Sequence, residues 1–145
     1  MRSKTFALLL AILMCVAGLC GCGEKPPQTI EDFAMEHPGT IKDIESSIDK
    51  AVMKDIDVTM TIEDNCITLT STLKDSIDSD EAKEIANQFE ANAKKLGKNC
   101  NTAIDNIKEA TQLEEVTIKM IFNNGDGKEM WSHAYDGSEK KEKSE

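Results

Sequence analysis

The feature that most constrains the fold is a repeated switch in the spacing of apolar residues. Residues 40–52 carry apolar side chains every three or four positions, and residues 56–73 then alternate apolar with polar side chains. Residues 78–111 return to helical spacing, and residues 116–136 alternate again. A period of about 3.6 indicates an amphipathic helix, and a period of 2 indicates a strand with one buried face. The chain is therefore predicted to alternate helical and extended segments.

Capping residues mark where the helices begin. Thr29 opens a T-x-x-D start before the short helical segment IEDFAME. His37-Pro38-Gly39 is expected to end that segment, because proline disfavours helix in the residue before it. Asp78 opens the long helix, in which Gly97 favours a kink. The apolar stripe of this helix is Ala82, Ile85, Ala86, Phe89, Ala93, Leu96, Cys100, Ala103, Ile104 and Ile107.

Each extended segment is predicted to form a hairpin. Asp64-Asn65 supplies a two-residue turn in the first, and the resulting register brings both apolar sets to one face. Residues 124–127 (NGDG) have the chemistry of a type I turn with a glycine bulge in the second. The register assumed there places Phe122 beside Met130. We expect this second hairpin to close the domain.

These elements predict a single α+β domain over residues 29–136. We expect a four-stranded antiparallel sheet made of two hairpins, with two main helices packed on one face and the order α-β-β-α-β-β. The sequence leaves open which strands join the hairpins. Residues 22–28 are predicted to be a tether, and residues 137–145 a disordered charged tail.

The N-terminus has the pattern of an exported bacterial lipoprotein. Arg2 and Lys4 precede an apolar stretch that is shorter than a membrane span of roughly 20 residues but suits a signal peptide. The stretch closes with Leu19-Cys20-Gly21-Cys22, which resembles a lipobox. That chemistry requires the last cysteine, because its thiol takes the diacylglyceryl group before the signal peptidase cuts. We predict removal of residues 1–21 and lipidation of Cys22; an uncleaved helix or cleavage elsewhere is the alternative.

Lipid on Cys22 predicts a place on the extracytoplasmic face of the cell membrane. Each buried methylene contributes about 0.8 kcal/mol, so two or three acyl chains give stable anchoring. The formal net charge of the whole chain is −10, and the leader removes two basic residues and no acidic one, which leaves −12. Such an acidic protein repels nucleic acid, and we expect no nucleic-acid partner.

Cys66 and Cys100 remain in the mature chain beside the lipidated cysteine. An exported protein with two such cysteines invites a disulfide. Cys100 belongs to the core stripe of the long helix, however, and Cys66 to the other face of the sheet. Bridged Cα atoms must come within roughly 7 Å. A disulfide and two unbridged thiols both stay open, with the face assignment against the bridge.

The only tryptophan and the only tyrosine, Trp131 and Tyr135, lie two positions either side of His133. The assumed register places them on the open face of the sheet with Ile121, Lys119 and several threonines. Exposed aromatic rings over a threonine surface are typical of a binding patch. Cross-strand packing on a half-exposed face is the alternative, and a one-residue register error would bury Trp131.

No catalytic motif stands out. His37 and His133 lack a spaced metal-binding partner, and NNGDGKE lacks the order of a calcium loop. We expect no cofactor, no metal and no enzyme activity. The leading prediction is a non-catalytic binding or assembly module, whose partner is an envelope protein or a wall polymer. The alternatives are a purely structural envelope accessory and a minimal envelope enzyme.

Four segments also carry a family resemblance: the T-I-E-D-F opening, the D/N hairpin, the D-S-D-E helix start and the final hairpin FNNGDGKEMWSHAYD. With them, residues 29–136 resemble a family of small Gram-positive lipoproteins that carry one domain of unknown function. The resemblance implies an envelope location and no known activity.

Overall fold

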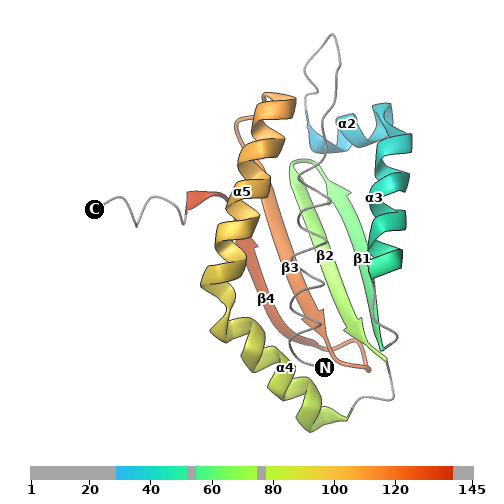
Figure 1. Ribbon diagram of the computed structural model, residues 1–145, viewed down its shortest axis with the longest axis vertical. Helices are drawn as coiled ribbons and strands as arrows, with labels where there is room; N and C mark the ends of the chain where they lie inside the picture. Colours follow the sequence, from blue (N-terminus) through green and yellow to red (C-terminus); the bar gives the residue numbers. More distant parts are fainter. Residues whose placement is uncertain (1–28, 52–54, 75–77, 139–145) are drawn as a thin grey trace.

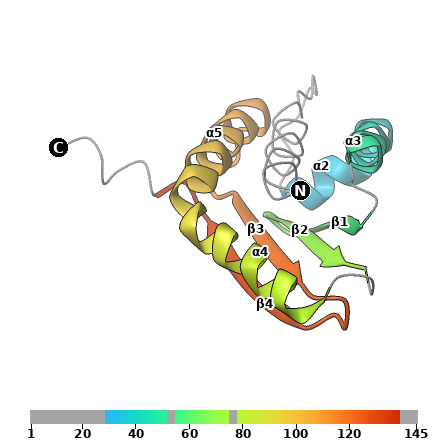
Figure 2. The same cartoon turned by 60° about the horizontal axis from the view of Figure 1, so that its bottom comes forward.

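The computed structural model describes residues 29–51, 55–74 and 78–138. The predicted leader, Cys22, the tether and most of the predicted tail lie outside these residues. The elements in chain order are α2 (Ile30–Glu36), α3 (Pro38–Ala51), β1 (Ile56–Glu63), β2 (Cys66–Leu73), α4 (Ser79–Ala91), α5 (Ala93–Thr111), β3 (Thr117–Asn123) and β4 (Glu129–Tyr135). These helices lie on one side of the sheet, with α2 and α3 over β1 and with α4 and α5 over β3 and β4 (Figures 1 and 2).

The sheet is mixed, which corrects the predicted antiparallel sheet. Its strand order is β1-β2-β3-β4; the two hairpins are antiparallel, but β2 and β3 run parallel. The cause is the connection through α4 and α5, which carries the chain back along the sheet, so that β3 starts at the same end as β2 (Figure 1). Parallel neighbours need a crossover of this kind. The predicted order α-β-β-α-β-β is also wrong, since each helical segment is a pair of helices.

The first hairpin has the predicted register. Glu63 pairs with Cys66 across the turn, and all eight residues of β1 have a partner in β2. Asp64 takes the left-handed conformation at φ 50°, which aspartate tolerates. The apolar sets share one face, where Ile67 and Leu69 are fully buried. Turn chemistry and apolar alternation specify the same pairing here, and both are satisfied.

The Asp64-Asn65 turn also holds the start of α2. Asn65 Oδ1 accepts a hydrogen bond from the Ile30 amide at 3.1 Å, and the Asp64 carbonyl accepts one from the Glu31 amide at 3.0 Å. The Glu31 carboxylate in turn accepts one from the Asp64 amide at 3.0 Å. The Asn65 carbonyl also accepts from Thr117, where β3 begins, at 2.9 Å. The first amides of a helix lack intrahelical partners. This turn supplies acceptors for the first amides of α2 and also holds the start of β3.

Two helix boundaries differ from the prediction. α3 begins at Pro38 and not at residue 40, where the helical spacing starts, because proline suits the first helical position, where its missing N–H is not needed. The long helix breaks at Asn92, with φ −104° and ψ 7°, and not at Gly97. The Asn92 side-chain amide donates to the Gln88 carbonyl at 2.8 Å. Such local bonds from asparagine compete with the helical pattern.

Replacing Asn65 with alanine tests the turn. Asn65→Ala removes the acceptor of the Ile30 amide, and Ile30 is buried, so we expect unfolding free energy to fall by about 1–2 kcal/mol. Urea titration of the full chain measures this. The control Asn99→Ala removes an exposed bond within α5 and should change stability by less than about 0.5 kcal/mol. Equal losses in the two variants would contradict the role of the turn.

Candidate functional site

A row of aromatic rings lies between β4 and the helices α4 and α5. Trp131 and Tyr135 of β4 are 8% and 1% exposed. The ring centroid of Phe89 on α4 lies 5.1 Å from those of Trp131 and Phe122. His133 lies between its two neighbours, 6.3 Å from Trp131 and 4.5 Å from Tyr135. These rings fill the layer between the sheet and the crossover helices.

The polar atoms of Trp131 and Tyr135 hydrogen-bond to α4 and α5. Trp131 Nε1 donates to the carboxylate of Glu90 at 2.8 Å, near the end of α4. The Tyr135 hydroxyl donates to the carbonyl of Ala93 at 3.0 Å, directly after the break at Asn92. A buried tryptophan or tyrosine usually finds such a partner. The two bonds hold both sides of the helix break against β4, which is a structural role.

The assumed register of the second hairpin was wrong by one residue. Its turn is as predicted: Gly127 has φ 79°, and Asn124 accepts the Gly127 amide at 3.0 Å. An irregularity beside Phe122 then shifts the pairing, so that Phe122 lies opposite Trp131 instead of Met130. An extra residue in one strand turns every later side chain to the other face.

The energetic reason is the area of the rings. A tryptophan or tyrosine buries about 150–250 Å². At about 25 cal/mol per Å², this is worth about 4–6 kcal/mol for each ring. The alternative register would bury Met130, Ser132 and Ala134, which offer less area. The difference exceeds the cost of about 1 kcal/mol for one interrupted strand hydrogen bond. Burying Trp131 and Tyr135 instead of Met130 and Ser132 therefore decides the register.

The predicted five-residue surface is consequently divided between two faces. Trp131, His133 and Tyr135 face the helices. Lys119 and Ile121 lie on the uncovered face of the sheet, in cross-strand rows with threonines of β1 and β2. Both are half-buried. The open face thus lacks the exposed aromatic rings on which the predicted binding patch depended.

Cys66 and Cys100 do not form a disulfide. Cys66 lies on the uncovered face, with its Sγ 3.8 Å from the Thr68 hydroxyl. Cys100 is fully buried on the helical side, where its Sγ lies 3.9 Å from the sulfur of Met120. The opposite faces expected from the apolar pattern are present, and they keep the two thiols apart.

An apolar hollow of about 370 Å³ lies where α2, α3 and β1 meet. Its apolar walls are Ala34, Met35, Pro38, Ile41 and Ile62. Met35 is 68% exposed and is the one large apolar side chain so exposed among the described residues. Ile41 and Ile62 are partly buried against the core. The hollow is shallow and open, and it offers an apolar floor to solvent.

The charged residues at the hollow are Glu31, Lys42 and Glu45. Sequence reasoning missed this site, because it joins Ile62 to helices some 25 residues earlier in the chain. One signal was available. Ile30 and Phe33 form the buried stripe of α2, and Met35 lies outside that stripe. A single exposed apolar residue is a weak signal. Met35 marks a site only because the fold places it beside Pro38, Ile41 and Ile62.

Metal-ligating side chains are not clustered in the described part of the chain. No three His, Cys, Asp or Glu side chains there are grouped to hold a metal ion. The Ser138 hydroxyl and amide hold the pKa of Asp136 below its usual range, but this carboxylate is exposed beyond β4. Over the same residues, no helix is long and apolar enough to cross a membrane.

Residues 30–135 match the model of a protein family described as a domain of unknown function, DUF4854. The chain belongs to the DUF4854 family. No curated protein and no solved structure matches it. The expectation of a domain of unknown function is confirmed, and the DUF4854 match spans α2 to β4. In this DUF4854 protein, the T-I-E-D-F opening and the D/N hairpin bond to each other, which gives both segments a structural role.

Fluorescence quenching tests the corrected register, because Trp131 is the only tryptophan. We expect acrylamide to quench the folded chain at least about threefold less than the urea-unfolded chain, since the ring is packed between Phe89 and β4. Equal quenching in the two states would mean that Trp131 is exposed on the open face and that the corrected register is wrong.

Proposed function

We propose that this protein is a lipoprotein held on the extracytoplasmic face of a Gram-positive cell membrane by lipid on Cys22, where it acts as a non-catalytic binding or assembly module. The lipobox-like Leu19-Cys20-Gly21-Cys22 supports the anchor. The single observation that carries the binding role is the open apolar hollow between α2, α3 and β1. Its partner would be an envelope protein or a wall polymer.

The hollow is close to the proposed anchor along the chain. Seven peptide units join Cys22 to Thr29 and reach at most about 25 Å when fully extended. Thr29 caps α2, and α2 forms one wall of the hollow. A molecule bound in the hollow would therefore be held near the membrane surface. This proximity suits a module that recruits or positions a partner at the membrane.

The chemistry of the hollow favours binding over catalysis. Its floor is apolar, and its three charged side chains stand at an open, shallow site. Catalytic sites use converging groups in a concave pocket that excludes water. The open apolar floor suits contact with an apolar side chain of another molecule better than it suits catalysis.

Metabolic labelling tests the anchor. We expect the chain expressed in a Gram-positive host to incorporate labelled palmitate and to fractionate with membranes. Cys22→Ala should abolish both, because the lipid-accepting thiol is lost. Cys66→Ala is the matched control and should keep both, since Cys66 lies on the folded sheet. Label that persists in Cys22→Ala would exclude lipidation at this cysteine.

Photo-crosslinking in living cells tests the hollow. A photoreactive amino acid at position 35 should give an adduct of defined mass, because Met35 is exposed at the hollow. The same group in place of exposed Lys98 on α5 should not give it. Ala34→Gln, which places a longer polar side chain in the hollow, should reduce the adduct at least about fivefold while the melting temperature is kept. Identical adducts from positions 35 and 98 would count against the hollow.

A further inference from the structure

The two edges of the sheet are protected to different extents. β4 carries the irregular pairing beside Phe122, and its rings are packed beneath α4 and α5. β1, with sequence IDVTMTIE, has an unbroken register over eight residues and contains no proline, glycine or lysine. Natural edge strands avoid pairing with other chains through bulges, prolines, charged side chains or a covering helix. β1 has charged side chains at Asp57 and Glu63, and α2 and α3 lie over its helical side, but it has no bulge and no proline. β1 is thus the less protected edge.

The outer backbone of β1 has no partner in the described residues. An edge strand directs alternate N–H and C=O groups away from its one neighbour. Backbone hydrogen bonds outside the sheet ladder are made just beyond both ends of β1, by Asp55 and Asp64. Within 29–51, 55–74 and 78–138, none is made by residues 56–63 themselves outside the β1–β2 pair. These groups are available to a further strand.

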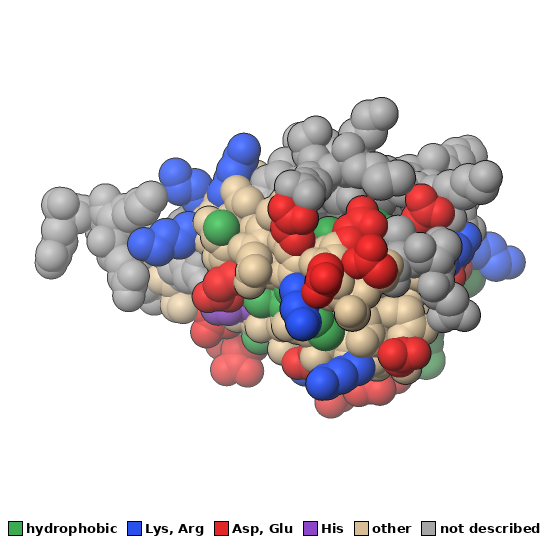
Figure 3. Space-filling view, turned by 90° about the horizontal axis from the view of Figure 1, so that it is seen from below, with side chains coloured by type: hydrophobic (Ala, Val, Ile, Leu, Met, Phe, Trp, Pro, Cys, Tyr) green, Lys and Arg blue, Asp and Glu red, His purple; other side chains and the backbone are tan. Residues whose placement is uncertain are grey.

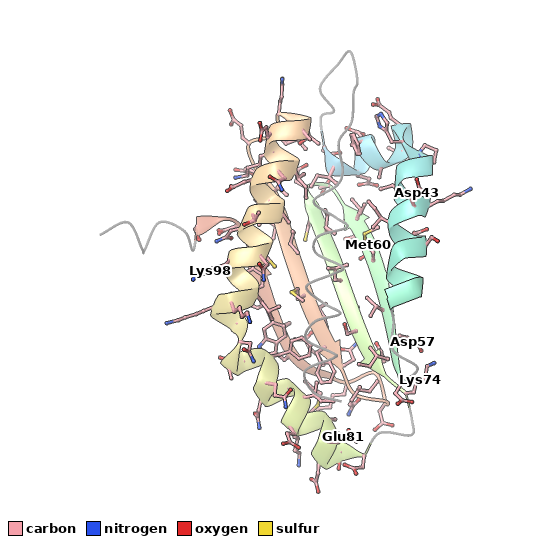
Figure 4. All side chains as sticks on the ribbon, viewed as in Figure 1. Asp43, Asp57, Met60, Lys74, Glu81 and Lys98 are labelled. Carbon is pink, nitrogen blue, oxygen red and sulfur yellow. The ribbon has the colours of Figure 1, made fainter. Side chains whose placement is uncertain are left out.

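An apolar row runs beside this edge. Val58, Met60 and Ile62 point to the helical side of β1 and are only partly buried. Ile62 continues the row into the hollow. In Figure 4, Met60 lies between β1 and α3. A strand added to β1 would place its own inward side chains against this row and complete its burial.

Acidic residues dominate the surface at this edge. Asp57 and Glu63 are exposed on the other side of β1, and Glu31 and Glu45 stand at the hollow with one lysine, Lys42. Lys74 offsets one of them, since it lies 3.7 Å from Asp57 (Figure 4). Acidic side chains also spread over the lower end of the molecule (Figure 3). A basic partner is favoured, and a second copy would bring like charges together.

We propose that β1 accepts an extended, basic segment of a partner protein as a fifth strand. Apolar side chains of the segment cover Val58, Met60 and Ile62, and its lysine or arginine side chains, on alternate positions, meet Asp57 and Glu63. This rests on the proposed binding function and names the geometry and charge of the partner. Backbone bonds supply affinity in such strand addition, and alternate side chains supply specificity.

The first experiment measures binding of a designed probe to the full chain in non-ionic detergent. The probe is a fluorescein-labelled ten-residue peptide of alternating valine and lysine, followed by anisotropy. We expect saturable binding that weakens with salt, and at least about tenfold weaker binding of the valine–glutamate peptide. Two N-methylated versions of the peptide carry methyl groups on either the odd or the even amides. The version whose methyl groups face β1 should not bind. Equal binding of all these peptides would overturn the proposal.

Two protein variants separate local from overall charge. Asp57→Asn with Glu63→Gln should weaken binding of the valine–lysine peptide by about three- to tenfold. Asp126→Asn with Glu109→Gln makes the same change in net charge at exposed positions in the β3–β4 turn and on α5, which packs on β3 and β4, and should alter binding by less than about twofold. Equal effects would show that only overall charge is sensed and would overturn the proposal.

Hydrogen–deuterium exchange locates the peptide. We expect exchange of β1 amides to slow at least about tenfold when the valine–lysine peptide is bound. Protection confined to α2 and α3, or absence of binding while position 35 still crosslinks, would overturn strand addition and leave the proposed function standing. Protection of β1 that rises with protein concentration alone would identify a second copy as the occupant and overturn the basic partner. Absence of both peptide binding and the adduct at position 35 would contradict both proposals.

Discussion

The Asp64-Asn65 turn is the point on which the arrangement of this domain depends. One side chain and two carbonyls there bond the first amides of α2 and the first amide of β3. These contacts set α2 against the end of the first hairpin, and α3 follows directly after α2. The hollow exists because α2 and α3 are held over β1 and not across the middle of the sheet.

Sequence reasoning succeeded where two local signals agreed. In the first hairpin, apolar alternation and the Asp64-Asn65 turn specify one register, and that register is present. In the second, the turn was identified correctly, but extending its register along β4 put Trp131 and Tyr135 outside. The aromatic alternating set of β4 was the better guide, since burial of two large rings outweighs one interrupted pair.

The parallel pairing of β2 with β3 could not be obtained from hairpin signals. It depends on how α4 and α5 return the chain along the sheet, which is a property of the whole domain. The break at Asn92 has a local part, the bond from its side chain to Gln88, and a tertiary part, because the Tyr135 hydroxyl donates to the carbonyl of Ala93 beside it. The hollow was missed for the same reason: its walls meet only when α2 and β1 are brought together.

The most direct test of this account is the amide exchange of Ile30, Glu31 and Thr117 measured by NMR. The account predicts that these three amides exchange as slowly as the buried amides of β2, and that all three accelerate together when Asn65 is replaced by alanine. Fast exchange at Ile30 and Glu31 in the unmodified chain, with β2 still protected, would contradict it. α2 would then not be fixed to the turn, and the hollow would not be a standing feature of the protein.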